Sequence, residues 1–149
     1  MSTIKVDTYL TRGGASEIAI DKLKGASSAG SMTVVGEGGS TTTNLQQGLA
    51  KSWVTFDASS GTPATSDSLN ASSLTDHATG KHTLVFSNAM GNANYAFSCG
   101  GSNFGTDSRF IHNNGAAPVA ASFRFITTND STSARDGTHN SVIIHGDLA

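Results

Sequence analysis

The chain has 149 residues, which is enough for one domain with its own core or for a small domain that carries an appendage. Only 36% of the residues are hydrophobic and 13% are charged, against usual shares of about 45–50% and about 25%. The formal net charge of -2 and the pI of about 6.2 exclude an overall field that would attract nucleic acid or an anionic membrane surface, so we expect neither partner.

The composition itself favours strands. Small polar residues and 17 glycines take the place of the missing apolar and charged residues. Every acidic residue after Glu37 is an aspartate, which favours turns, whereas glutamate favours helix interiors. Low net charge and regular alternation argue against ordinary disorder. The composition therefore predicts an all-β protein with long polar loops that completes its core by pairing with copies of itself.

The first 20 residues predict two short strands. Ile4, Val6 and Leu10 alternate with polar residues, and a turn at residues 12–14 leads into a second apolar pair at Ile18 and Ile20. An isolated hairpin of this size is only marginally stable in water. We expect a docking arm that gains its core from a neighbouring protein or from sister chains; the alternative is an edge hairpin of the main domain.

Residues 22–43 are mostly small and predict a linker or shaft, with one strand at Met32–Val35. The next segment carries the one indication of a helix. Leu45, Leu49 and Trp53 are spaced to share a helix face, so we expect them to form an oligomer interface around a threefold axis. Alternatively, the leucines close the base of the β domain.

Strand-like alternation dominates from residue 52 onward, beginning with Ser52–Asp57. Residues 80–97 read as a hairpin: His82, Leu84 and Phe86 share one face of the first arm, and Tyr95 and Phe97 resume the period on the second. Further strands are expected near Leu69 and Leu74, at residues 109–111, at residues 119–127 and at residues 141–145. Six to eight strands at this spacing predict an antiparallel β-sandwich.

Several of these segments resemble a known family. They are STIKVDTYLTRGG at the start, the AK-W-F pattern around Trp53, the SS-TD-TG turn before Lys81 and the A-NYA arm that ends at Ala96. In these segments the chain is similar to short virion proteins of tailed bacteriophages, many of them marine. After Gly101 only the general composition and a late apolar strand match. The resemblance implies a trimeric tail-fibre or tail-fibre-like module. Residues 1–51 would form the attachment arm, shaft and short helix, and residues 52–149 the sandwich head.

Residues that could carry catalysis or hold a metal are scattered along the sequence. The five histidines lie outside any metal-ligand spacing, and the single Cys99 suits a small buried apolar residue better than a reactive thiol. We expect no metal and no cofactor; His112, in three copies at a trimer axis, is the weak candidate for a metal site. No nucleophile elbow, phosphate loop or paired carboxylates stand out, so no catalytic residue and no enzyme activity are expected.

Two polar loops are the candidate ligand-binding surface. Asparagine, aspartate, arginine and an occasional aromatic ring can bind sugars through hydrogen bonds and stacking. The ligand-binding residues that we predict on these loops are Asn103, Phe104, Asp107, Arg109, Arg135 and Asp136. Alternatively, the loops are polar only because they are solvated.

Together these observations predict a non-enzymatic virion protein, most readily a homotrimeric tail fibre. Its N-terminal arm would bind other virion proteins, and its loops would bind host surface glycans. The alternatives are a trimeric capsid decoration protein that stabilises the shell and a small glycan-active enzyme. No apolar run of signal-peptide length or membrane-spanning length occurs, so we expect assembly in the host cytoplasm and no membrane insertion.

Overall fold

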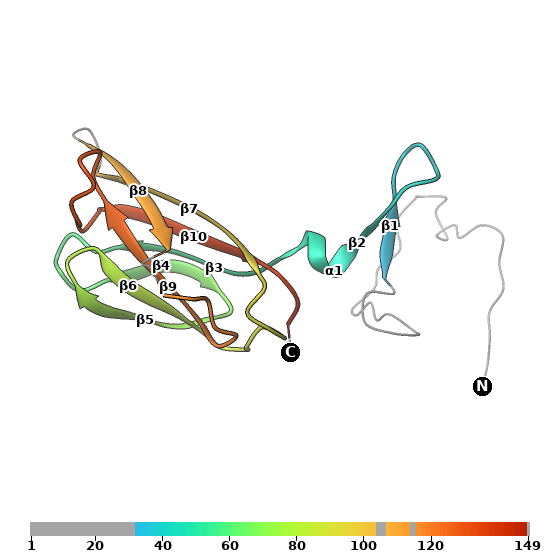
Figure 1. The fold of residues 1–149 in the computed structure, drawn as a ribbon, viewed down its shortest axis with the longest axis horizontal. Coiled ribbons are helices and arrows are strands. Elements are labelled where there is room, and N and C mark those ends of the chain that lie inside the picture. Colours follow the sequence, from blue (N-terminus) through green and yellow to red (C-terminus); the bar gives the residue numbers. More distant parts are fainter. Residues whose placement is uncertain (1–31, 104–106, 114–115, 149) are drawn as a thin grey trace, which may run out of the picture.

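The computed structural model describes residues 32–103, 107–113 and 116–148. These residues form ten strands and one helical turn (Figure 1). The bounds are β1 Thr33–Val35, β2 Thr42–Asn44, α1 Leu45–Gly48, β3 Ala50–Asp57, β4 Ala64–Leu69, β5 Ala71–Ala78, β6 Lys81–Phe86, β7 Ala96–Asn103, β8 Asp107–Asn113, β9 Ser122–Thr128 and β10 His139–His145. Within this described part no helix has the length and apolar character to span a membrane.

Eight strands form one antiparallel sheet in the order β4-β3-β10-β7-β8-β9-β6-β5. The sheet folds over between β7 and β8, so that β4, β3, β10 and β7 face β8, β9, β6 and β5 across a common core (Figure 1). Strands β7, β8 and β9 follow one another, and β10 returns beside β7, which is a Greek key arrangement. The prediction of an all-β, antiparallel, sandwich-like fold is thus confirmed.

The core is built from β3, β6, β9 and β10, in which buried side chains alternate with more exposed ones. In β6 every second residue is buried: Leu84 and Phe86 share one face, as predicted, and the structure shows that this face points into the core. Strand β9 does the same with Phe123 and Phe125. Phe125 meets Phe56 of β3 across the two layers, with ring centroids 5.8 Å apart. Full burial of each such side chain contributes roughly 1.5–3 kcal/mol, so these rings hold the layers together.

The hairpin predicted for residues 80–97 is wrong. Its two arms form β6 and β7 as strands, but β6 pairs with β5 and β9, while β7 pairs with β10 and β8. The connection between them carries two buried side chains, Met90 and Tyr95, and the Tyr95 hydroxyl donates to the Ser122 carbonyl oxygen at 2.8 Å. These anchors close one end of the core, so the chain crosses between the layers and does not fold back on itself.

The predicted helix over residues 44–53 is also mostly wrong. Only Leu45–Gly48 is helical, Leu49 is 54% exposed, and Trp53 lies in β3 opposite Leu69 and Ile143. Glycine at position 48 disfavours helix by about 1 kcal/mol relative to alanine. From Ala50 onward the backbone forms ladders with β4 and β10, which leaves no helix face for the three residues to share.

Before the sandwich, β1 and β2 form a small hairpin that includes the strand predicted at residues 32–35. It is joined to α1 by the Leu45 N–H, which donates to the Met32 carbonyl oxygen at 2.9 Å. The hairpin and α1 lie beyond one end of the sandwich (Figure 1). The strands predicted for residues 2–20 lie outside the described residues.

Candidate functional site

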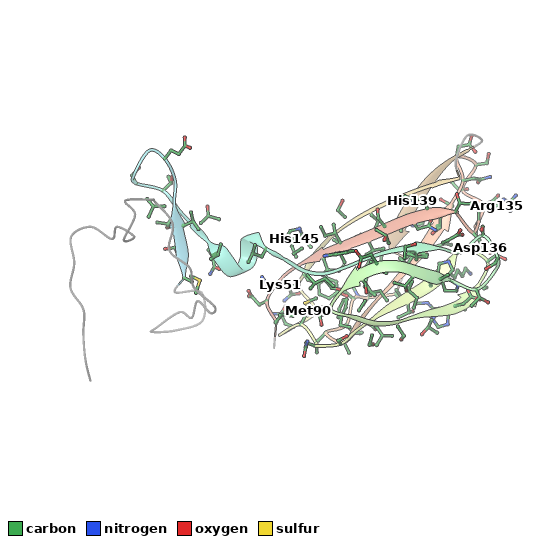
Figure 2. The ribbon with its side chains drawn as sticks, turned by 180° about the vertical axis from the view of Figure 1, so that it is seen from behind. Lys51, Met90, Arg135, Asp136, His139 and His145 are labelled. Carbon is green, nitrogen blue, oxygen red and sulfur yellow. The ribbon has the colours of Figure 1, made fainter. Side chains whose placement is uncertain are left out.

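Antiparallel pairing divides the loops of the sandwich between two ends. The end opposite α1, here called the distal end, carries the β3–β4 loop, the β5–β6 turn, the end of β7, the start of β8 and the β9–β10 loop (Figure 1). Figure 2 shows Arg135, Asp136 and His139 at this end, and Lys51 and His145 at the other. The described ends of β7 and β8, which flank one predicted ligand loop, therefore lie at the same end of the molecule as the β9–β10 loop.

Two of the predicted ligand-binding residues lie at the tip of the paired strands β7 and β8. Asn103 ends β7 and is paired with Asp107, which begins β8; Arg109 is paired with Gly101 farther along. Phe104 lies outside the described residues. Strand β10 lies on the other side of β7, where His139 is paired with Ser102. The backbone thus places Asn103 and Asp107 beside the start of β10.

The β9–β10 loop is held by local hydrogen bonds. The Thr132 N–H donates to the Asn129 carbonyl oxygen at 3.0 Å, and the Ser133 N–H donates to the Asn129 carboxamide oxygen at 2.9 Å. Thr132 has a φ of 61°, a left-handed conformation that only a tight turn imposes on threonine. Arg135 follows this turn with an exposed side chain, whose Nη1 donates to the Ala134 carbonyl oxygen at 3.2 Å. Its position suits the predicted ligand-binding role.

Asp136 differs from the surface carboxylate that we predicted. Its side chain is only 17% exposed, and its Oδ1 accepts the Gly80 N–H at 2.6 Å. The Gly80 backbone makes a second hydrogen bond, because its carbonyl oxygen accepts the Thr127 N–H at 2.7 Å. Asp136 therefore joins the β9–β10 loop to the β5–β6 turn. One carboxylate oxygen of Asp136 is thus hydrogen-bonded within the chain, and its ligand-binding role stays a prediction.

Behind Asp136 lies a buried histidine whose importance the sequence did not reveal. His82 of β6 has no exposed surface, and its ring packs between Phe56 and Phe125 with centroid distances of 5.6 Å and 5.8 Å. Its Nδ1 lies 3.4 Å from Asp76 Oδ1, and its Nε2 lies 3.7 Å from Asp136 Oδ1. Neither ring nitrogen has a hydrogen-bond partner.

Burial lowers the pKa of His82 below its usual value, while the charges of Asp136 and Asp76 oppose that shift. The predicted alternation placed His82 on an apolar strand face, which was the only sequence signal for its burial. Nothing in the sequence linked it to Asp136, which is far along the chain and on a loop.

The residues predicted to form an oligomer interface are separated in the fold. Leu45 is partly buried in α1, and Leu49 is exposed after it. Trp53 lies on the outer face of the first layer in a row with Leu69 and Ile143, where Leu69 is 47% exposed. We call these three residues the outer row. Trp53 therefore belongs to a different surface from the two leucines.

The remaining candidates are one histidine and one cysteine. His112 is exposed, and its Nδ1 lies 3.1 Å from the Asn113 carbonyl oxygen. Within the described residues no group of three or more histidine, cysteine, aspartate or glutamate side chains could hold a metal ion. Cys99 packs against the core, and burial raises the pKa of its thiol to about 12, so it is a thiol at neutral pH.

Comparisons with known proteins yield no relative. No protein-family model matches the chain, and neither the curated proteins nor the solved structures contain a significant match. The resemblance to phage virion proteins therefore remains a prediction from the sequence segments quoted above, and the function has to be argued from the arrangement of the chain.

Proposed function

We propose that the chain is a non-enzymatic virion protein of a tailed bacteriophage, a homotrimeric tail fibre assembled in the host cytoplasm. Its N-terminal part would attach to other virion proteins, and its distal end would bind host surface glycans. The observation that carries the proposal is the two-ended layout: β1, β2 and α1 lie at one end of the sandwich, and the β9–β10 loop and the paired ends of β7 and β8 lie at the other (Figure 1). A fibre needs this separation of attachment from recognition.

The distal end has the chemistry for weak recognition of sugars. Arg135 offers an exposed guanidinium, and the backbone places Asn103 and Asp107 at the tip of the neighbouring strands. Arginine donors suit sugar hydroxyls and the carboxylates of acidic glycans. One such site binds weakly, but three copies on each fibre raise the effective concentration of sites enough to hold a particle on a cell.

Exposed apolar side chains support the trimeric part of the proposal. The side chains of Leu49 and of the outer row lie at or near the surface. Only 36% of the residues of this chain are hydrophobic, so the chain has few apolar side chains that it can leave in contact with water. Sister chains that covered these side chains would remove them from water, at roughly 25 cal/mol per Å².

Binding of the purified full-length chain to immobilised host envelope polysaccharide tests the recognition. We expect Arg135→Ala to weaken binding on the order of tenfold, since a hydrogen bond to a charged group contributes about 1.5 kcal/mol or more. Arg124→Ala is the matched control, because Arg124 is also exposed but lies in the middle of β9, away from the distal loops. Equal effects of the two variants, or release of new reducing ends from the polymer, would contradict a non-enzymatic distal site.

The outer row favours a second candidate, a trimeric capsid decoration protein. Leu69 and Trp53 lie on the flank of the sandwich and not at its tip. A protein clamped between capsid subunits would need apolar contacts on its flank. Cryo-electron microscopy of the intact particle separates the two functions: density for the sandwich at the tail favours the fibre, and density on the shell favours decoration.

A further inference from the structure

The two nitrogens of the His82 ring face two oxygens that can only accept hydrogen bonds. Nδ1 faces Asp76 of β5 at 3.4 Å, and Nε2 faces Asp136 of the β9–β10 loop at 3.7 Å. A neutral imidazole carries a single N–H, so in either tautomer one nitrogen presents a lone pair to a carboxylate. Only the doubly protonated ring can donate to both carboxylates.

The other groups around the ring oppose protonation. Strands β3 and β9 contribute the uncharged rings of Phe56 and Phe125, and the ring is fully buried between them. From β5, His77 adds a weaker effect in the same direction as burial, whereas Asp76 and Asp136 act against it. Burial is the largest of these effects on the pKa, so the ring is neutral at pH 7 and takes up a proton under acidic conditions.

We propose that Asp76, His82 and Asp136 form a proton-operated latch between the β5–β6 turn and the β9–β10 loop. When His82 takes up a proton, both ring nitrogens carry an N–H, and each N–H draws the carboxylate that it faces into hydrogen-bond distance. Asp136 also accepts the Gly80 N–H, so a movement of its carboxylate changes the hydrogen bond at the turn. Arg135 directly precedes Asp136, so the latch acts on the backbone next to an exposed guanidinium at the distal end. The latch does not depend on which ligand the distal end binds.

Nuclear magnetic resonance on the full-length chain tests the latch directly. Thr79–Gly80 is the only Thr–Gly step in the sequence, so ¹³C-carbonyl threonine combined with ¹⁵N-glycine isolates the Gly80 amide signal. Ring ¹⁵N signals of His82, assigned through contacts to the Phe125 ring, report its proton state. We expect the ring to become doubly protonated below pH 6.5, and the Gly80 amide to shift with the same midpoint.

Either of two results would overturn the latch. One is a His82 ring that stays neutral down to the pH at which the chain unfolds. The other is a Gly80 amide that does not follow the midpoint of His82, or that follows the exposed His112 instead.

A pair of variants tests the role of the carboxylate. Asp136→Asn keeps the size of the side chain and an oxygen for the Gly80 N–H but removes the charge. We expect the midpoint of His82 to fall by about 1 pH unit or more, as for loss of an opposite charge at this distance. Asp130→Asn lies in the same loop, where Asp130 contacts Ser131, and should leave the midpoint unchanged. Equal shifts in the two variants would contradict the proposed contact.

Discussion

Replacing Gly80 with alanine is expected to destabilise the sandwich by about 3–5 kcal/mol. Gly80 has a φ of 69°, a conformation that costs other residues about 1–2 kcal/mol. In addition, a Cβ at this position would lie 2.5 Å from the Thr127 carbonyl oxygen and 2.7 Å from the Arg135 backbone nitrogen. Both neighbours are backbone atoms, so the turn itself must move. That movement weakens the hydrogen bond from the Gly80 N–H to the Asp136 carboxylate, which is worth about 1.5–3 kcal/mol.

Gly61→Ala is the matched control for this variant. Gly61 has a similar φ of 83°, but a Cβ there would meet nothing within 4 Å. It should therefore lose only the conformational contribution, about 1–2 kcal/mol. Urea unfolding followed by circular dichroism measures both free energies, and heating should show a larger drop in Tm for Gly80→Ala, at about 4–8 °C per kcal/mol. Equal losses in the two variants would refute the close approach of the β5–β6 turn to the β9–β10 loop.

Three further predictions concern the core, the pH dependence and the assembly. Phe123→Ala should cost about 3–5 kcal/mol in urea unfolding, and Phe97→Ala clearly less, because Phe123 is fully buried whereas Phe97 is 39% exposed; similar losses would place the core elsewhere. The folded-state pKa of His82 lies below its unfolded value, so its contribution to stability is present above about pH 6.5 and is lost as the pH falls through and below that value; urea unfolding should show this loss, and His82→Leu should remove it. Leu49→Ser should shift sedimentation from trimer towards monomer without lowering the Tm of the sandwich at high dilution, and an unchanged trimer would exclude Leu49 from the interface.

The distal site shows where prediction from sequence stops. Polar loops with arginine and aspartate were visible in the sequence, and Arg135 does lie on an exposed loop at the distal end. For Asp136 nothing in the sequence indicated its hydrogen bond within the chain, because sequence does not reveal whether a loop carboxylate faces solvent or a backbone N–H of another loop. Here the partner is Gly80, and the hydrogen bond between them joins segments that are 56 positions apart.

The N-terminal part shows a second kind of limit. The spacing of Leu45, Leu49 and Trp53 matches a helix face, yet the residues around Trp53 also match a strand. Local spacing cannot decide between the two when an apolar run is short. The ladders that Ala50–Asp57 forms with β4 and β10 decide it in favour of the strand.

By itself, the sequence determined that the chain forms strands and which residues share one face of a strand. A period of two is local: Leu84 and Phe86, or Phe123 and Phe125, face one side of a strand wherever that strand lies. The tertiary structure alone decided which strands pair, that β6 and β7 separate into different layers, and that Asp76 and Asp136 meet at His82. The physical reason is that all strand edges offer the same backbone donors and acceptors, so the choice of partner depends on packing between residues far apart in the chain.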